Sequence, residues 1–306
     1  MVQSSKKAGL TSLGFSIETE VRNWGDVLLQ EISEHFLNTE DLGHKFSGAA
    51  FGGSLLSQNY LNLSKEKSPV GQLLFYGCGI RDRHEILTDL QRISIYGVRG
   101  KFSEAILRTE AIGDPGILAP FIYDLSKSYS NLNESPFLFI PHMSDPNQNP
   151  KIDSCFETIE PLIGLRESAK RIVEKVAQAS FVLTGSLHVG IVAFALGTPF
   201  SFYKNDFVDS PIKYYDFASF YDIPVSFSAN ISDGINFWLS NSGSYSRLTE
   251  KSIRKLHGGK ISEFLKEGIE SDKIRDFLTA RTELINLKQN FLTSLSDNPS
   301  SNLAAN

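Results

Sequence analysis

The segment from Thr184 to Gly190 places a serine and a histidine where a helix is predicted to begin. Ser186 can cap that helix, and His188 falls in its first turn. A helix N-terminus offers unbonded backbone N–H groups and the positive end of the dipole, which attract phosphate and carboxylate. The dipole lowers the pKa of a histidine and a bound dianion raises it, so we expect His188 to exchange a proton near neutral pH. The structural alternative is that His188 only packs in the first turn of the helix and takes no part in catalysis.

A second polar group, Asn23-Trp24-Gly25-Asp26, directly precedes an amphipathic helix predicted over Val27 to Leu37. Asp26 is expected to cap that helix, because a carboxylate can accept from the free N–H groups of the first turn. Gly25 permits a close backbone approach. Helix capping alone would explain why an aspartate stands at position 26, and the functional alternative is that its carboxylate binds a ligand.

Two glycine-rich turns, Gly52-Gly53-Ser54 and Gly77-Cys78-Gly79, each follow a predicted strand. Ligands of open α/β sheets bind beyond the carboxyl ends of the strands, so the turns together indicate a shared crevice. The second turn begins like a dinucleotide fingerprint, but Asp82 stands where the third glycine would pack against the helix. This difference argues against NAD or FAD.

Several other catalytic motifs are missing from the sequence. It has no Walker A loop and no Asp-x-Asp pair, and its six histidines show no metal-ligand spacing, so we predict no metal and no cofactor. Thr184 stands where a nucleophile elbow around Ser186 would need glycine, which argues against a serine hydrolase. The two cysteines, Cys78 and Cys155, are too few for a disulfide framework and fit a reducing compartment.

These residues depend on strands and helices that alternate along the chain, which is typical of an α/β fold with parallel sheets. We predict strands over 72–76, 92–98, 136–141 and 181–183, and helices over 103–108, 167–179 and 186–196. Gly197 ends the last of these helices, and Pro199 prevents its continuation. From Leu248 onward the pattern is mostly amphipathic helix, interrupted at Gly258-Gly259.

Composition is that of a globular protein, with 306 residues, 41% hydrophobic and 21% charged. The formal charge of -5 argues against nucleic acid as a partner. The most apolar stretch, 190–203, is too short to span a membrane and contains Pro199. We expect a cytoplasmic protein without a transmembrane segment, and peripheral membrane contact stays open.

We predict an N-terminal domain over 1–125, a second domain over 135–246, helices over 247–296 that pack on the body, and a flexible tail over 297–306. The polar stretch 126–134 is the expected linker. Within the C-terminal helices, some of five apolar residues are expected to be buried: Ile274, Phe277, Leu278, Leu284 and Leu287.

An ordered series of motifs links the chain to a known family. The series comprises Asn-x-Gly-Asp at Asn23 to Asp26, the two glycine turns, Gly97-Val98-Arg99-Gly100, Ile112 to Leu118, and the Ser-Leu-His block followed by Ala195 to Pro199. From Leu10 to Lys213 the chain resembles the polysaccharide pyruvyltransferases. The resemblance implies two Rossmann-like domains that face each other across a cleft, as in the glycosyltransferase-B fold. It also implies phosphoenolpyruvate as donor and a saccharide or lipid-linked glycan as acceptor.

The resemblance assigns roles to individual residues. Pyruvyl ketal formation needs an acid and a base, and His188 and Asp26 are the expected catalytic residues. Arg99 can pair with carboxylate or phosphate. His142, after the strand over 136–141, can contact either substrate or be structural. The expected substrate-binding residues are Asn23, Gly25, Gly53, Arg99, His142 and Ser186.

One residue departs from the pattern. Many members have arginine where this chain has Ser186, so Arg99, Arg81 or Arg83 would supply the positive charge for the donor. Two other functions stay open. A glycosyltransferase that uses a nucleotide sugar would share the architecture, and a catalytically degenerate glycan-binding protein would explain the missing arginine.

Overall fold

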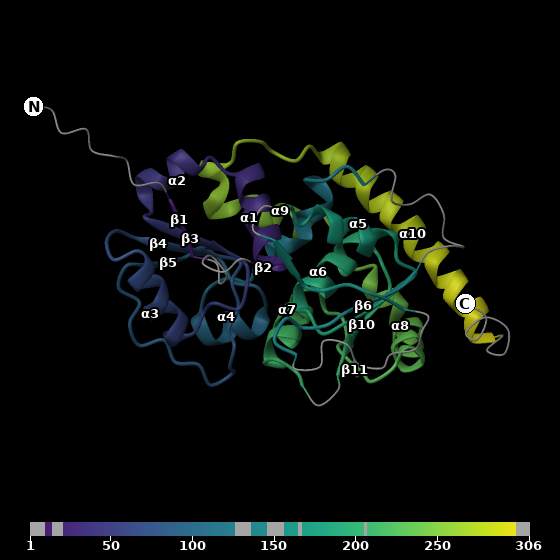
Figure 1. Cartoon of the computed structure of the whole chain (residues 1–306). Coiled ribbons are helices and arrows are strands. Elements are labelled where there is room, and N and C mark those ends of the chain that lie inside the picture. Colours follow the sequence, from purple (N-terminus) through teal and green to yellow (C-terminus); the bar gives the residue numbers. More distant parts are fainter. Residues whose placement is uncertain are drawn as a thin grey trace, which may run out of the picture.

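The protein is described here by a computed structural model, which covers residues 10–13, 21–125, 136–145, 156–164, 167–204 and 207–297. Two parallel sheets, one from each half of the chain, lie side by side with helices packed around them (Figure 1). The α/β class predicted from the alternating pattern is confirmed. The expected linker and all but the first residue of the expected tail lie outside the described residues.

The first sheet has four parallel strands in the order β1-β3-β4-β5. Leu74 and Tyr76 of β4 join the large hydrophobic core, whereas Leu73 and Phe75 join a smaller core, as the alternation of a strand requires. The strands are β1 (Thr11–Ser12), β3 (Gly48–Phe51), β4 (Leu73–Tyr76) and β5 (Ile93–Ile95). Helices α1 (Trp24–Phe36), α2 (Thr39–Lys45), α3 (Gln58–Lys67) and α4 (Lys101–Leu107) belong to this half.

The second sheet has five parallel strands in the order β11-β10-β9-β6-β7. Its strands are β6 (Phe137–Ile140), β7 (Phe156–Thr158), β9 (Phe181–Thr184), β10 (Phe200–Tyr203) and β11 (Phe227–Ser228). Its helices are α5 (Lys170–Gln178), α6 (Leu187–Leu196), α7 (Ile212–Tyr221) and α8 (Ile231–Tyr245). Helix α6 is apolar almost all round and nearly every residue in it is buried, so it lies inside the molecule. As predicted, Gly197 ends it in the left-handed conformation, with a φ of 75°.

Three further elements join the halves. Strands β2 (Val21–Asn23) and β8 (Leu162–Gly164) form a small antiparallel pair, and the Trp24 N–H donates to the Pro161 carbonyl at 3.1 Å. The 3₁₀ helix η1 (Pro115–Phe121) packs against both α1 and α6. These contacts set the start of α1 against the start of α6.

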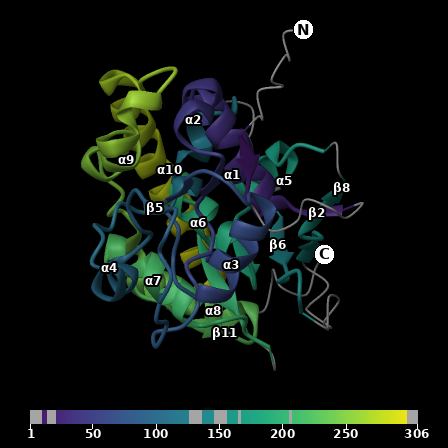
Figure 2. The ribbon, with the colours of Figure 1, turned by 90° about the vertical axis from the view of Figure 1, so that its left-hand side faces the viewer.

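The C-terminal elements cross between the two halves. Helix α9 (Glu250–Leu256) and the 3₁₀ helix η4 (Gly259–Phe264) lie beside α1 and α2, and the Asn38 N–H donates to the Phe264 carbonyl at 2.7 Å (Figures 1 and 2). Helix α10 (Ser271–Asp297) then runs along the second half. The expectation that some of the five apolar residues are buried is confirmed, because Ile274 and Leu284 are buried, whereas Leu287 is 53% exposed.

Helix α10 carries two buried cations. Arg281 donates to the carbonyls of Phe194 at 2.7 Å and Ala195 at 3.0 Å, in the last turn of α6. Lys288 donates to the Ala177 carbonyl, in the last turn of α5, and to the Thr198 hydroxyl, both at 3.0 Å. Positive groups therefore meet the negative ends of two helix dipoles.

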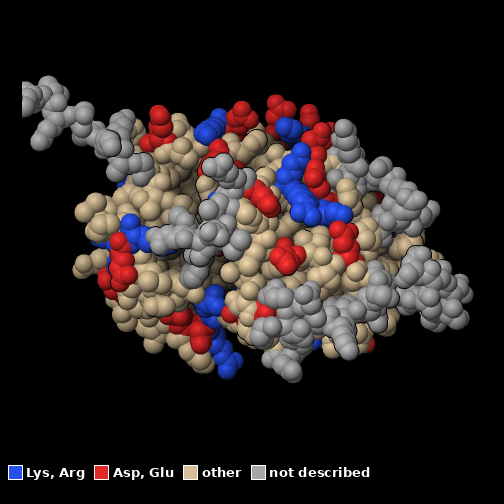
Figure 3. Space-filling model, viewed as in Figure 1, with Lys and Arg blue, Asp and Glu red and all other residues tan. Residues whose placement is uncertain are grey.

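On the face shown in Figure 3, basic and acidic side chains are interspersed over the described residues rather than gathered into one broad patch. Among the described residues, none of the helices combines the length and apolarity needed to cross a bilayer.

Candidate active site

A cavity of about 320 Å³, here called the central cavity, is lined by loops and helix starts from both halves of the chain. From the first half come Asn23, Asp26, Gly53, Ser54, Leu55, Tyr60 and Arg81. From the second half come His142, Met143, Ser144, Pro161, Ser186, Leu187, His188, Asp209 and Lys213. The structure thus brings together six of the eight residues expected at the site. Gly25 and Arg99 lie behind its wall.

Helix α1 presents Asp26 to the cavity because Asn23, and not Asp26, caps it. The helix begins at Trp24, three residues earlier than predicted, and the Asn23 side chain accepts from the Gly25 N–H at 3.2 Å. Asp26 therefore stands in the first turn, and the expectation that it caps the helix was wrong. Its half-buried side chain lines the central cavity and a neighbouring one.

Gly25 lies directly against the ring of His188. A Cβ atom at position 25 would stand 2.2 Å from Nδ1 and 2.6 Å from Cγ of that ring. Only glycine leaves room for the imidazole, so the two motifs interlock. The close approach expected for Gly25 is observed, and its partner is the histidine of the other motif.

The N-terminus of α6 also faces the central cavity. Ser186 occupies the N-cap position, but its side chain makes no capping hydrogen bond, contrary to expectation. Its backbone N–H instead donates to the Thr184 hydroxyl at 2.9 Å. The loop is held by the Tyr214 hydroxyl, which donates to the Gly185 carbonyl at 2.6 Å. The first turn of α6 thus has no side-chain cap and is suited to an anion.

The environment of His188 keeps its imidazole neutral. Burial lowers its pKa from 6.5 to about 3, and the charges of Lys213 and Arg99 act in the same direction. The residue as a whole is only partly exposed, and its Nε2 is buried and has no hydrogen-bond partner among the described residues. The pKa lies further below neutrality than the helix terminus alone suggested, because burial dominates. A bound anion would raise it.

Opposite α6, one carboxylate holds two cations. Asp209 pairs with Lys213 at 2.5 Å and with Arg81 at 2.7 Å, and it lies 3.4 Å from Nε2 of His142. The same Nε2 is 3.2 Å from the Lys213 ammonium. With two cations and one carboxylate, this cluster carries a net positive charge at neutral pH.

The pKa values of the cluster follow from burial and from the mutual charges. Burial lowers the pKa of Lys213 to about 8, although Asp209 opposes the shift. Burial and the Lys213 charge lower the pKa of His142 to about 4. Burial alone would raise the pKa of Asp209, but Lys213, Arg81 and His142 hold it below its usual value. His142 is thus neutral at pH 7.

Sequence reasoning named Arg81 as a source of charge but missed Asp209 and Lys213. Asp209 precedes α7 (Ile212–Tyr221), and Lys213, four residues later, is a single lysine in its first turn, ahead of the aromatic run Tyr214 to Tyr221. That isolated charge beside an apolar run was the one available signal. A role for Asp209 can be inferred only from the structure, which places Arg81 and His142 beside it.

Arg99 lies behind the cavity wall. Its side chain is 0% exposed, pairs with Asp216 at 3.3 Å and donates to the Ser54 hydroxyl at 2.9 Å. A Cβ at Gly79 would come within 2.2 Å of its Nη2. Asp216 also accepts from the Ser103 hydroxyl at 2.6 Å. Arg99 therefore ties α7 to the first sheet and supports Ser54, which lines the cavity.

One comparison with known proteins identifies a family. A family model described as polysaccharide pyruvyl transferase matches residues 29–206, more than half of the chain. Among curated protein sequences, none matches. A crystal structure of a functionally uncharacterised protein from Klebsiella pneumoniae is 14% identical, with 69% of this chain and 87% of that chain covered and a TM-score of 0.39, a likeness too weak to carry a conclusion.

Proposed function

Because the chain belongs to the polysaccharide pyruvyl transferase family, we propose that it transfers the pyruvyl group of phosphoenolpyruvate to a hydroxyl pair of a saccharide. The product is a cyclic pyruvate ketal, and inorganic phosphate leaves. One observation carries this proposal: the central cavity combines two cations, the uncapped N-terminus of α6 and a neutral histidine.

The cavity suits the charges of the donor. Phosphoenolpyruvate carries a phosphate and a carboxylate, and Arg81, Lys213 and the first-turn amides of α6 are groups that bind such anions. Arg81 and Lys213 then serve in place of the arginine that many members have at the position of Ser186. Arg99 supports this surface through Ser54 rather than by direct contact.

The reaction requires two carbon–oxygen bonds to form at one carbon. The double-bond electrons take a proton at the methylene carbon while the first hydroxyl oxygen bonds to the neighbouring carbon. The bond to phosphate then breaks, and the second hydroxyl bonds to the same carbon. Of the two protons lost by the hydroxyls, one is accounted for by the new hydrogen of the methyl group and the other leaves with the phosphate.

Two residues of the cavity fit the proton transfers. Asp26 is suited to accept the hydroxyl protons. His188 takes up a proton when the dianionic donor raises its pKa, and it delivers that proton to the methylene carbon. An empty site keeps His188 neutral, so the acid forms only with donor bound.

The arrangement of the chain supports a glycosyltransferase-B-like fold. Two parallel sheets flank the central cavity, and the C-terminal elements return to the first half before α10 crosses to the second. We infer that the sheets are the cores of two Rossmann-like domains and that the cavity is the cleft between them.

The test is incubation of the protein with phosphoenolpyruvate and a panel of saccharides. A pyruvyltransferase releases phosphate in step with a product whose mass has grown by one pyruvate less one water. Nucleotide sugars serve as the rival donors in the same assay and in a thermal-shift titration. Stabilisation by a nucleotide sugar alone would favour a glycosyltransferase, and saccharide binding without phosphate release would favour a degenerate glycan-binding protein.

A further inference from the structure

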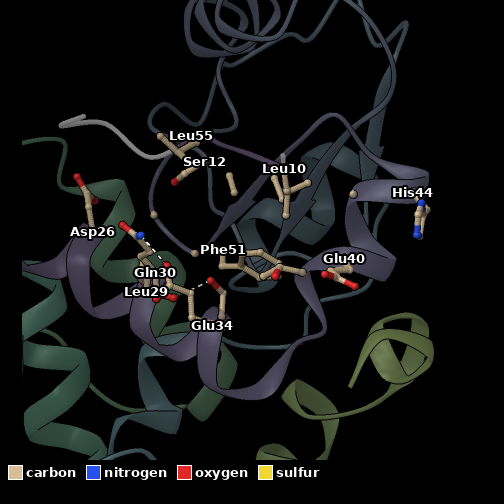
Figure 4. Close-up of a pocket in the computed structure, with 17 residues that line it drawn as sticks. Leu10, Ser12, Asp26, Leu29, Gln30, Glu34, Glu40, His44, Phe51 and Leu55 are labelled. Carbon is tan, nitrogen blue, oxygen red and sulfur yellow. Dashed lines mark hydrogen bonds between the residues drawn. The ribbon is translucent and has the colours of Figure 1, made fainter. Parts of the chain in front are cut away.

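A second and larger cavity, of about 700 Å³, lies between α1, α2 and the carboxyl end of β3 (Figure 4). We call it the α1–α2 cavity. Asp26, Gln30 and Glu34 enter it from successive turns of α1, Glu40 enters it from α2, and Phe51 comes from the end of β3. Its volume is in the range of pockets that hold small organic ligands.

The charge of this cavity differs from that of the central cavity. Its lining includes three carboxylates, those of Asp26, Glu34 and Glu40, and among the described residues that line it there is no lysine or arginine. An anionic ligand would meet like charge there. The α1–α2 cavity is therefore a poor second site for phosphoenolpyruvate or for any acidic sugar.

The polar groups of the lining suit a ligand rich in hydroxyls. The Gln30 amide donates to the Glu34 carboxylate at 2.7 Å, so the two side chains are already aligned on one face of α1. Carboxylates accept from hydroxyls, an amide both donates and accepts, and the Phe51 ring offers an apolar face. Hydroxyls of Ser12, Ser33 and Thr39 also line the cavity.

The two cavities meet at shared walls. Asp26, Gly53 and Leu55 line both of them. A sugar held along the α1 face would therefore have its hydroxyls at Asp26, beside the groups of the central cavity. No other carboxylate among the described lining residues belongs to both cavities.

We propose that the α1–α2 cavity is the acceptor subsite and that it takes an uncharged saccharide whose reacting hydroxyl pair lies at Asp26. The proposal rests on the proposed function, which it deepens by stating where the acceptor binds and which class of acceptor is excluded. Glu34 and Glu40 act against uronic acids and phosphosugars, and Gln30 and Glu34 bind the ring hydroxyls.

The experiment measures saccharide binding by saturation-transfer NMR with saturating phosphoenolpyruvate. The probes are neutral methyl hexopyranosides and methyl glucuronide. Neutral glycosides should bind, with the glucuronide at least about tenfold weaker. Gln30→Ala and Glu34→Ala should each weaken neutral binding about tenfold, the scale of one lost hydrogen bond to a charged or amide group. Glu34→Arg should restore binding of the glucuronide.

Controls separate this proposal from the proposed function. Glu66→Arg changes an exposed glutamate of α3 that lines neither cavity and should leave all saccharide binding unchanged. Calorimetry should give the same affinity for phosphoenolpyruvate in every variant. Three results would overturn the acceptor subsite even if phosphoenolpyruvate binds. They are no saccharide binding at all, saccharide affinities that do not change with these substitutions, and equal affinities for the glucuronide and the neutral glycosides. If the unsubstituted protein does not bind phosphoenolpyruvate, the proposed function is overturned, and saccharide binding that still responds to these substitutions would then identify the α1–α2 cavity as a saccharide site without a pyruvyl donor.

Discussion

The side chain of His188 is neutral in the unliganded protein because it is buried and faces the charges of Lys213 and Arg99. Its chemistry therefore depends on what enters the central cavity. Replacement of His188 by Gln keeps a polar side chain of similar length. We expect folding and donor binding to be largely retained and turnover to fall by about 10² to 10⁴, the usual range for a general acid or base.

The matched control is His257→Gln. That histidine is also half-buried with a pKa lowered by burial, but it lines neither cavity. Turnover of the control should stay close to that of the unsubstituted enzyme. Near-normal turnover of the His188 variant would contradict a catalytic role and would mean that the ring only packs in the first turn of α6.

Gly25 gives a second prediction at this scale, because a methyl group there would overlap the imidazole of His188. Gly25→Ala should lower the free energy of unfolding by about 1 to 3 kcal/mol, as overpacking does. His188→Ala removes the obstructing ring, so the double variant should recover part of that loss. Urea unfolding of the two single variants and the double variant forms the cycle, and strictly additive losses would contradict the contact.

At the scale of elements, Arg281 and Lys288 of α10 donate to carbonyls in the last turns of α6 and α5. Burial lowers the pKa of Lys288 to about 7, whereas an unfolded lysine has a pKa of about 10.5. Between those values the unfolded chain holds a proton that the folded chain has released. Raising the pH through this window therefore favours the folded state.

We accordingly expect unfolding experiments to show a rise in stability from pH 7 to pH 9 that is smaller in Lys288→Met. The other titrating groups, including Arg281, are present in both proteins, so their contributions to the pH dependence of stability cancel in the comparison. Lys273→Met, on the exposed first turns of the same helix, is the control and should keep the full rise. Identical pH profiles for all three proteins would exclude a buried, titrating Lys288.

Elements with strong local signals were predicted well. Helix α6 was predicted almost to the residue, because an apolar run ends at Gly197 and Pro199 stops any continuation. The start of α1 was misplaced because both Asn23 and Asp26 are good capping residues, and only the pairing of β2 with β8 decides between them. The cluster of Asp209 and Lys213 with His142 could not be predicted, since chain crossovers bring these distant segments together.

At the scale of the whole molecule, one hydrophobic core runs through both halves. It contains Trp24 of α1 and Trp238 of α8, which are the two tryptophans of the chain. Single-tryptophan variants, Trp24→Phe and Trp238→Phe, thus report on one half each. We expect the tryptophan-fluorescence and circular-dichroism unfolding curves of each variant to share one midpoint in urea, because a common core unfolds in one cooperative step.

The limits predicted for the two domains, 1–125 and 135–246, remain a prediction that this experiment addresses. A fluorescence midpoint well separated from the circular-dichroism midpoint of the same variant would mean that each half folds on a core of its own. Circular dichroism serves as the second probe, since it follows all the helices regardless of which tryptophan remains.

The position of α10 also bears on how the protein is made. Arg281 binds a carbonyl 87 positions earlier in the chain, and Lys288 binds a hydroxyl 90 positions earlier. At ribosomal speeds of about 5 to 20 residues per second, α6 waits roughly 5 to 20 s for these partners. During that interval the Phe194 carbonyl can accept from the Gly197 N–H, but it lacks its second donor, the Arg281 guanidinium. The helix whose first turn faces the central cavity is therefore completed by almost the last described residues to leave the ribosome.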